Sequence, residues 1–475
     1  MQITVVGTGY VGLVTGTCLA QLGHQVTCLD VDHAKILALR AGKVPIFEPG
    51  LEPLVHGQQA SGRLQFVDNY EDAVRRAEAL FICVGTPSLP NGGADMSYVE
   101  AAARSIGEHL GPQYCVIINK STVPIGSGDW VGMLVRQGIT RAAALSAASP
   151  ARVMAEAEGR DTPTPKAGAA TLTTPGARPD FDVVSNPEFL REGSAVEDAL
   201  NPDRIVIGAD TERAVERMRA LYAPLLRRNE TLGRHVPFVV TDRASAEMVK
   251  YASNAFLATK ISFINEIANI CERVGADVTE VTRGIGLDDR IGRAFLNAGI
   301  GWGGSCFPKD LASLSHTGRE YGYESRLLDA VVDVNDSQKL VVIRKLQERL
   351  KLVKGKTIAL WGLAFKPGTD DMRDAPSLLI ADRLSEMGAA VRAYDPEAMD
   401  AARRRGVRAE LCKDPYDAAQ DADAVILVTE WSEFAALDWP RLHAVMRRRL
   451  IVDGRNCLDR TLLLWQGFEY CGIGR

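Results

Sequence analysis

The sequence has no apolar run that approaches the roughly 18 residues of a membrane-spanning helix, although 46% of its 475 residues are hydrophobic. Its start also lacks the layout of a secretion signal. Residues 2–6 lead directly into a glycine-rich turn, as a buried first strand would. These two absences predict a cytoplasmic protein with no membrane partner.

The sequence has no large excess of either basic or acidic residues. The chain has 55 basic and 60 acidic residues, mixed along its length, for a net charge of -5. Proteins that bind nucleic acids generally present a basic surface, so we expect no nucleic-acid partner. This composition leaves room for an anionic small molecule, because a phosphate site needs only a few well-aimed donors.

Paired cysteines are missing as well. The chain has nine cysteines, an odd number, and no CxxC pair. Without a secretion signal this argues against a disulfide framework, and no metal site is predicted. Most of the cysteines are expected to be small buried apolar residues. Cys306 is the exception, for the reasons given below.

What the sequence does contain is a repeated alternation of strands and helices. The length suggests roughly three domains. Five short apolar runs, separated by amphipathic stretches such as residues 98–110, predict a parallel sheet with helices on both faces. The predicted strands are residues 3–6, 26–30, 64–67, 79–84 and 115–119.

The middle of the chain departs from this alternation. Residues 139–179 are rich in Ala, Thr, Pro and Gly, which predicts a flexible surface insertion. Strands are expected again at 181–185 and near 204–207. Residues 245–272 then form one long helix with apolar residues on several faces, which is typical of a central strut or a dimer interface.

A second long helix is predicted over residues 329–351, as a connector. From residue 355 the chain resembles its own beginning, since IALWGLAFK is similar to ITVVGTGYVG and VRAYDP to VTCLDVD. We therefore predict an α/β protein. Two Rossmann-like doubly wound domains are joined by a helical central domain that contains the long central helix.

The first turn of the chain carries a dinucleotide-binding pattern. Gly7 permits a tight turn, Gly9 lets the backbone approach a pyrophosphate, and Gly12 lets the following helix pack closely on the strand. Asp30 ends the next predicted strand, where an acid bonds ribose hydroxyls and repels a 2′-phosphate, so NAD is favoured over NADP. The alternative is a glycine-rich turn without a ligand. Lys35 is either a further ribose contact or a solvated helix residue.

The segment GWGGSCFPKD holds the strongest candidate for chemistry. Ser305 is a plausible N-cap and Pro308 fits a first helical turn, which would place Cys306 at a helix N-terminus, where the dipole stabilises a thiolate. Asp310 lies four residues on, and therefore on the same face. The alternative is a buried structural cysteine in a tight turn.

Three further groups of polar residues have a spacing that suggests a site. Lys250 and Asn254 share a face of the long helix, although an isolated lysine can also reach solvent. In SNPEFLREG, Asn186 looks like an N-cap and Pro187 like the first helical residue. Glu188 and Glu192 would then share a face, as site residues or as partners of the helix dipole.

Thr122 follows a predicted strand, at the carboxyl end where open sheets bind their ligands. A capping role is the alternative for this threonine.

These motifs resemble those of the UDP-glucose/GDP-mannose dehydrogenases. The matching pieces occur in the family's order and span nearly the whole chain. They are VVGTGYVG, VGTP, KSTVP, SNPEFLREG, KYASNAFLATKISFINE, GGSCFPKD, FKPGTDDMRDAP and DGRN.

The resemblance implies a four-electron oxidation in which the C6 alcohol of a nucleotide sugar becomes a carboxylate through a cysteine-bound intermediate. It assigns the nucleophile to Cys306, oxyanion stabilisation to Lys250 and Asn254, and the base for thioester hydrolysis to Glu188. Asp310 and Thr122 would hold a water or move protons. Whether Lys250 or a water on Asp310 takes the first proton stays open.

The resemblance also implies binding residues. The expected NAD contacts are Gly7, Gly9, Tyr10, Val11, Gly12, Asp30, Lys35, Val84, Gly85, Thr86, Pro87, Thr122, Glu192, Lys309 and Arg373, the last with a structural ion pair as its alternative. The expected contacts with the UDP-sugar are Glu188, Phe189, Leu190, Lys250, Asn254, Arg290, Phe295, Gly303, Cys306, Phe307, Phe365, Lys366 and Arg455. Because the family builds its site at a dimer interface, Arg290 is expected to reach a neighbour's substrate in a homodimer or larger homo-oligomer.

The implied domains are an NAD-binding Rossmann domain at 1–210, a helical central and dimerisation domain at 211–325, a connecting helix at 326–354 and a UDP-sugar-binding Rossmann-like domain at 355–475. The 139–179 insertion departs from the family, whose connection there is usually shorter. It leaves the motifs intact.

Within the family, NAFLATKISFINE and GGSCFPKD resemble the UDP-glucose branch, whose product is UDP-glucuronate for polysaccharide biosynthesis. The alternatives are the same chemistry on GDP-mannose or UDP-N-acetylmannosamine, or a two-electron alcohol dehydrogenase acting on a nucleotide sugar.

Overall fold

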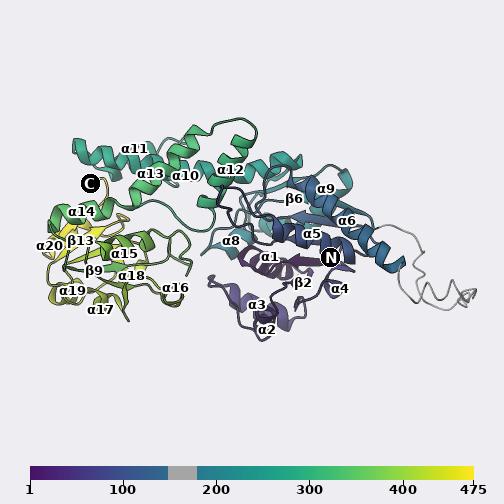
Figure 1. The fold of residues 1–475 in the computed structure, drawn as a ribbon, viewed down its shortest axis with the longest axis horizontal. Coiled ribbons are helices and arrows are strands. Elements are labelled where there is room, and N and C mark those ends of the chain that lie inside the picture. Colours follow the sequence, from purple (N-terminus) through teal and green to yellow (C-terminus); the bar gives the residue numbers. More distant parts are fainter. Residues whose placement is uncertain (148–178) are drawn as a thin grey trace, which may run out of the picture. The chain divides into compact units, whose positions relative to one another are not determined.

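The computed structural model describes residues 1–147 and 179–475, which divide into two compact units. The first unit comprises Met1–Leu89 and Ala94–Lys250, and the second comprises Pro90–Gly93 and Tyr251–Arg475. Each unit is built around its own sheet (Figure 1).

The first unit contains an eight-stranded sheet with the order β3-β2-β1-β4-β5-β6-β7-β8. All described pairings are parallel except β6 with β7. The first six strands have the order of a doubly wound dinucleotide-binding sheet, as predicted. The bounds are β1 (Gln2–Val6), β2 (Gln25–Leu29), β3 (Leu64–Val67), β4 (Ala79–Ile82), β5 (Cys115–Asn119), β6 (Phe181–Ser185), β7 (Ile205–Gly208) and β8 (Phe238–Thr241).

Two hydrophobic cores lie on opposite faces of this sheet because strand side chains alternate in direction. Val5 and Phe81 belong to one core, whereas their neighbours Val6, Leu80 and Ile82 belong to the other. The covering helices are α1 (Tyr10–Gln21), α2 (His33–Arg40), α3 (Leu51–Ala60), α4 (Tyr70–Val74), α5 (Ser97–His109), α6 (Ser127–Ala147), α8 (Ala195–Leu200) and α9 (Glu212–Thr231).

Part of the predicted insertion is helical. Helix α6 continues through Ala147, so the prediction of flexible structure is wrong for residues 139–147. This stretch is rich in alanine, the best helix former, and nothing in it stops the helix. The rest of the predicted insertion, residues 148–178, lies outside the described residues.

The second unit contains a six-stranded parallel sheet with the order β11-β10-β9-β12-β13-β14. This order repeats that of β3-β2-β1-β4-β5-β6 in the first sheet, in agreement with the similarity between the two ends of the sequence. The strands are β9 (Thr357–Trp361), β10 (Ala390–Tyr394), β11 (Glu410–Leu411), β12 (Ala424–Leu427), β13 (Leu450–Asp453) and β14 (Glu469–Cys471). The helices that follow α10 (Arg243–Val274) are α11 (Val278–Ile285), α12 (Phe307–Glu320), α13 (Arg326–Lys339), α14 (Val341–Leu350), α15 (Pro376–Glu386), α16 (Met399–Arg405), α17 (Pro415–Ala419), α18 (Ser432–Ala435), α19 (Trp439–Val445) and α20 (Arg460–Trp465).

The predicted long helix is α10, which spans Arg243–Val274, or 32 residues. Its start, up to Lys250, belongs to the first unit, and the remainder belongs to the second. In the second unit, Ala258, Ile264 and Ala268 of this helix are completely buried. A helix of this length therefore contributes side chains to both units.

The second predicted long helix, over residues 329–351, is instead a pair of helices, α13 and α14, that meet at Leu340. The amide of Ile343 bonds to the carbonyl of Leu340 at 3.1 Å, a tight turn in place of the helical ladder. Beyond the break, Val341 and Val342 are buried in the core beneath the second sheet. Tertiary burial redirects the chain here, and no proline or glycine marks the position.

The hydrophobic core of the second unit predicts a large loss of stability when one of its buried side chains is shortened. The ring of Phe434 is fully buried and stacks on Trp361 with 5.5 Å between ring centroids. Phe434→Ala should therefore cost about 3–5 kcal/mol of unfolding free energy, because it removes contacts and leaves a cavity. Calorimetry should show a lower melting temperature for this variant. The matched variant Trp465→Ala, whose side chain is 80% exposed, should change the free energy by less than about 0.5 kcal/mol. Equal losses for the two variants would contradict this account of the core.

Candidate active site

The glycine-rich turn between β1 and α1 has the geometry that its pattern predicts. Gly7 has φ of +96°, and a Cβ on Gly12 would lie 1.9 Å from the Gly7 carbonyl oxygen, so neither tolerates a side chain. No atom lies within 4 Å of a Cβ built on Gly9, which precedes the first turn of α1. This turn therefore leaves space beside a helix N-terminus, where a pyrophosphate binds in such folds.

Asp30 follows β2 and is fixed in an ionised state. It accepts hydrogen bonds from the Thr8 amide at 2.9 Å, the Thr8 hydroxyl at 2.7 Å and the Lys35 ammonium at 2.9 Å. Burial opposes ionisation, but the bonds from the Asp32 amide, Lys35 and Thr8 outweigh it and lower the pKa of Asp30. Lys35 is thus paired with Asp30 in the structure. The Asp30 carboxylate lies at the end of β2, where the ribose of the cofactor is expected.

The segments that follow β4 and β5 are joined by hydrogen bonds. Thr86, in the 84–87 segment, donates to the carbonyl of Thr122 at 2.8 Å, and Ser121 donates to the carbonyl of Val84 at 2.8 Å. Gly85 has open space where a side chain would be. The predicted cofactor residues of this edge, Pro87 included, therefore lie next to Thr122 in one unit.

Tyr10 and Val11 occupy the first turn of α1. The Tyr10 hydroxyl bonds to the carboxylate of Glu48, which also accepts from the amides of Gly193 at 2.7 Å and Ala195 at 2.7 Å. Burial, followed by the bond to Glu48, raises the pKa of Tyr10. Glu48 thereby connects this turn with the chain next to Glu192.

A buried ion pair joins Glu188 and Lys250. The ammonium lies 2.7 Å from Oε1 of the carboxylate, and the side chains are only 5% and 6% exposed. Burial alone would raise the pKa of Glu188, but Lys250, the Leu190 amide and Lys120 together lower it. Glu188 is therefore a carboxylate at neutral pH, held against a cation.

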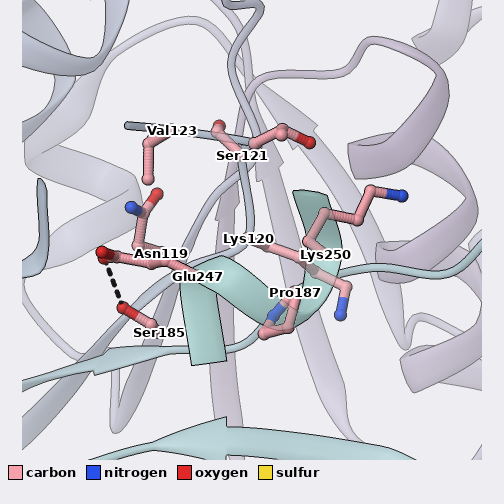
Figure 2. A pocket seen from close by; sticks show the side chains of 9 residues that line it. Asn119, Lys120, Ser121, Val123, Ser185, Pro187, Glu247 and Lys250 are labelled. Carbon is pink, nitrogen blue, oxygen red and sulfur yellow. Dashed lines mark hydrogen bonds between the residues drawn. The ribbon is translucent and has the colours of Figure 1, made fainter. Parts of the chain in front are cut away.

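Lys250 of this pair lines a polar pocket at the carboxyl ends of β5 and β6 (Figure 2). The empty space there, counted together with the open solvent at its mouth, is about 270 Å³. Its lining residues are Asn119, Lys120, Ser121, Thr122, Val123, Ser185, Pro187, Glu247 and Lys250. Ligands bind at this edge of an open α/β sheet, so the pocket is where the fold predicts a site.

Several of these lining residues have no role in the sequence analysis. Lys120 is buried and donates to the side chain of Asn186 at 3.2 Å. Glu247 precedes Lys250 by three residues on one helix, a spacing that puts both side chains on one face. This spacing is the feature of the sequence that could have indicated Glu247 as a site residue. Asn119 and Ser185 can be recognised as pocket residues only from the arrangement of the strands in the sheet.

The predicted helix at Asn186 and Pro187 does not form. The segment after β6 is irregular, and the next helix, α8, begins only at Ala195. Asn186 instead donates to the carbonyl of Val206 at 2.7 Å and accepts from the Tyr222 hydroxyl at 2.6 Å. Two buried tertiary bonds thus replace the predicted cap, and Glu188 and Glu192 share no helix face.

In the second unit, Cys306 is the N-cap of helix α12. The sequence predicted Ser305 for this position, but the cap lies one residue later, and the Ser305 hydroxyl lies 3.7 Å from the cysteine sulfur. Pro308 occupies the first turn, as expected. Cys306 is half-buried, and its place at a helix N-terminus favours the thiolate.

Asp310, one turn after Cys306, is almost completely buried and satisfied by two donors. The amide nitrogen of Asn254 lies 2.5 Å from one carboxylate oxygen, and the ammonium of Lys309 lies 2.5 Å from the other. The Asp310 amide also bonds to the carbonyl of Cys306 at 3.0 Å. The structure thus brings Asn254, Cys306, Lys309 and Asp310 together.

The loop before Cys306 packs against the 365–374 segment. A Cβ on Gly303 would lie 2.2 Å from the Asp374 carbonyl oxygen, and one on Gly304 would lie 2.7 Å from the Phe365 ring. Arg455 donates to the carbonyls of Gly301 at 2.9 Å and Val428 at 2.8 Å. Several of the predicted substrate residues therefore surround this glycine loop.

The remaining residues predicted to contact the UDP-sugar make contacts of their own in the structure. Phe307 packs on Trp302, Lys366 lies 5.4 Å from the centre of the Phe365 ring, and the Phe189 ring, next to Leu190, lies beneath Arg204 at 3.9 Å.

Arg373 pairs with Asp371 at 2.8 Å, which agrees with its structural alternative. Arg290 pairs with Asp288 at 2.7 Å and is 88% exposed. Phe295 has φ of +64°.

Comparison with known proteins places this chain in a family. Residues 1–226 match the NAD binding domain of the UDP-glucose/GDP-mannose dehydrogenase family, residues 244–337 its central domain and residues 359–460 its UDP binding domain. The chain belongs to the UDP-glucose/GDP-mannose dehydrogenase family. Its first unit therefore carries the family's NAD-binding domain, and the open glycine turn and ionised Asp30 fit that cofactor.

Individual relatives match along the full chain. It is 46% identical to a UDP-glucose 6-dehydrogenase of Rhizobium meliloti (strain 1021), with 100% of each chain covered. It is 44% identical to the UDP-glucose 6-dehydrogenase TuaD of Bacillus subtilis (strain 168), covering 100% of this chain and 93% of the relative.

Among solved structures, a UDP-glucose dehydrogenase of Pyrobaculum islandicum has a TM-score of 0.84 at 38% identity, with 99% and 97% of the chains covered. A UDP-D-ManNAc dehydrogenase of Pyrococcus horikoshii has a TM-score of 0.80 at 25% identity, with 100% and 99% covered.

Two features are absent from the described residues. No helix there has both the length and the hydropathy to cross a membrane. No group of three or more His, Cys, Asp and Glu in residues 1–147 and 179–475 is arranged to hold a metal ion.

The Glu188–Lys250 pair predicts a pH-dependent cost when its cation is removed. Lys250→Met leaves Glu188 buried without its partner, so we expect a loss of about 3–5 kcal/mol of unfolding free energy at pH 7. In the wild type the pKa of Glu188 lies below its ordinary value of 4.5. The pair's contribution is therefore present above that pH and fades as pH falls through the native pKa.

Denaturant unfolding at several pH values between 3 and 8 measures this difference between the variant and the wild type. The exposed residue Lys43 in the same unit provides the control, Lys43→Met, which should stay within about 0.5 kcal/mol of the wild type at every pH. A Lys250→Met loss of the same size at pH 3 and pH 8 would be inconsistent with an ionised pair.

Proposed function

We propose that this protein is an NAD-dependent UDP-glucose 6-dehydrogenase, which oxidises the C6 hydroxymethyl group of UDP-glucose to the carboxylate of UDP-glucuronate. The observation that carries this proposal is full-length identity of 46% and 44% to UDP-glucose 6-dehydrogenases. Solved relatives named for UDP-D-ManNAc and GDP-mannose are 25% and 29% identical, below the 38% of a UDP-glucose dehydrogenase.

The reaction needs two oxidations and one hydrolysis. NAD, when bound, accepts one hydride in each oxidation. The C6 alcohol first loses a hydride and a proton to become an aldehyde, and the Cys306 thiolate adds to the aldehyde carbon. The resulting thiohemiacetal oxyanion loses a second hydride and becomes a thioester. Water then cleaves the carbon–sulfur bond, which releases the carboxylate, two protons and the free thiolate.

The surroundings of each side chain support its role in these steps. Cys306 stands at a helix N-terminus, which lowers the cost of a thiolate. Lys250 and Asn254 are donors suited to an oxyanion. The bond from the Asn254 amide nitrogen to Asp310 uses one of its two hydrogens and orients the group. Glu188 is an ionised carboxylate, as a base for thioester hydrolysis must be.

Binding roles are proposed for the remaining residues. In the first unit the glycine turn, Asp30 and the 84–87 segment would hold NAD. In the second unit Lys366 and Arg455 would hold the UDP-sugar. The proposed domain limits are those of the sequence analysis, with NAD binding in 1–210 and UDP-sugar binding in 355–475.

We infer a homodimer from the surface of α10. Phe256, Phe263 and Ile270 are 65%, 50% and 48% exposed. They are spaced seven residues apart, so they form one apolar stripe on the helix. Such a stripe is typical of a helix that packs against a partner. The exposed Arg290 is then available to a neighbouring subunit.

We also infer that the protein works in the cytoplasm. All nine of its cysteines are free, as expected in a compartment that keeps thiols reduced. Both NAD and nucleotide sugars are diffusible anionic substrates, which a protein of net charge -5 binds through localised donors.

The proposal predicts that two NADH are formed for each UDP-glucose consumed, with no free aldehyde, because capture by Cys306 retains the intermediate. Absorbance at 340 nm together with chromatography of the nucleotide sugars measures this ratio. GDP-mannose, UDP-galactose and UDP-N-acetylmannosamine, assayed in parallel, should react more slowly. A ratio of one would identify a two-electron alcohol dehydrogenase.

The cysteine variants complete this test. Cys306→Ala should abolish UDP-glucuronate formation, since no thioester can form. Cys457→Ala, at an exposed cysteine, should leave both the rate and the ratio unchanged. Substantial acid formation by Cys306→Ala would refute the covalent route while leaving the oxidation itself intact.

A further inference from the structure

The buried carboxylate of Glu247 joins three segments of the first unit. Its Oε1 accepts from the Ser185 hydroxyl at 2.8 Å and from the Gly128 amide at 3.0 Å, and its Oε2 accepts from the Gly126 amide at 2.7 Å. Ser185 ends β6, the glycines stand at the start of α6, and Glu247 itself is on α10. Figure 2 shows the bond between Ser185 and Glu247. The mechanism above uses none of these bonds.

This arrangement caps α6 from a different helix. The first amides of a helix have no partner within it, and a negative charge beside them is favoured by the helix dipole. Gly126 has φ of +89°, which turns the chain into α6 at this point. Burial raises the pKa of Glu247, although the bonds from Ser185, Gly126 and Gly128 counteract it. A buried carboxylate is costly, so these three bonds are what make its position tolerable.

The same short stretch of α10 is attached twice to the chain that leaves β6. Glu247 bonds to Ser185, and three residues further along both segments Lys250 bonds to Glu188 at 2.7 Å. Glu247 and Lys250 also line the same pocket. Two attachments with matching spacing fix the rotation and the translation of the start of α10, up to Lys250, against this strand end.

We propose that Glu247 is a positioning residue for Lys250. It fixes the start of α10 on β6 and α6, and this places the Lys250 ammonium on Glu188 and at the reacting oxygen. The inference rests on the proposed function, because Lys250 is assigned its chemistry there. A side chain that acts in this way changes turnover through Lys250 and leaves the glycine turn of the cofactor site untouched.

The direct test is Glu247→Gln, which keeps the shape of the side chain and removes its charge. A glutamine offers an NH₂ group toward the backbone N–H donors, so at least one of the three bonds is lost. We expect kcat to fall about 10- to 100-fold, as for a catalytic group displaced by a fraction of an ångström to one ångström. The dissociation constant for NAD should stay within about twofold of the wild type, and Glu216→Gln, at an exposed glutamate of α9, should change neither quantity.

A double-mutant cycle separates positioning from a general loss of stability. In a Lys250→Ala background, single-turnover rates should fall by less than about twofold on adding Glu247→Gln, because the residue acts through Lys250. Full multiplication of the two losses would overturn the proposal, as would a Glu247→Gln enzyme with normal kcat.

Hydrogen exchange provides a readout that does not depend on activity. At least one of the amides of Gly126 and Gly128 should exchange faster in Glu247→Gln than in the wild type, because it loses its acceptor. Unchanged exchange would overturn the proposal even if activity fell. A wild-type enzyme that reduces no NAD with any nucleotide sugar would instead refute the proposed function, and the exchange result would still test the attachment itself.

Discussion

The ion pair between Glu188 and Lys250 is the interaction on which the rest of this site depends. Each partner is nearly inaccessible to solvent, and each would be costly to bury alone. Together they keep an ionised carboxylate beside an ammonium that lines the pocket. The proposed chemistry needs both, since one group stabilises an oxyanion and the other activates water. The pair thus keeps two reactive groups charged in surroundings that would otherwise neutralise them.

The two sheets share a topology, but the acid that follows the second strand has different surroundings in each. Asp30 and Asp395 each follow the second strand of their unit, β2 and β10. Asp30 leaves part of its carboxylate accessible beside an open glycine turn. Asp395 is completely buried and accepts from the Leu363 amide at 2.6 Å and the Trp431 indole at 3.1 Å. In the second unit the acid is therefore enclosed by internal hydrogen bonds.

Much of the fold could be predicted from the sequence because it depends on local patterns. The strands of the first sheet, the long helix α10 and the similarity between the two sheets follow from hydrophobic periodicity and from an internal repeat. The failures occurred where tertiary contacts override local preference. Leu340 interrupts a helix because the valines that follow are drawn into a core, and Asn186 forms no cap because its amide bonds to β7 and α9.

The candidate site was predictable to the extent that its residues carry a recognisable motif. The glycine turn, Cys306 at a helix N-terminus and the spacing of Lys250 and Asn254 are local signals. The roles of Lys120 and Glu247 depend on which strand ends meet at the pocket, and that information is not contained in any short segment. Asp310 illustrates an intermediate case, because its helix face was evident but its bonds to Asn254 and Lys309 were not.

The central claim is that Cys306 carries the sugar covalently, and intact-protein mass spectrometry tests it most directly. Glu188→Gln should slow thioester hydrolysis, so this variant, mixed with UDP-glucose and NAD and then quenched, should gain the mass of one oxidised nucleotide sugar. Peptide mapping should locate the adduct on Cys306. Accumulation of UDP-glucuronate with no adduct on that peptide at any time would contradict the account.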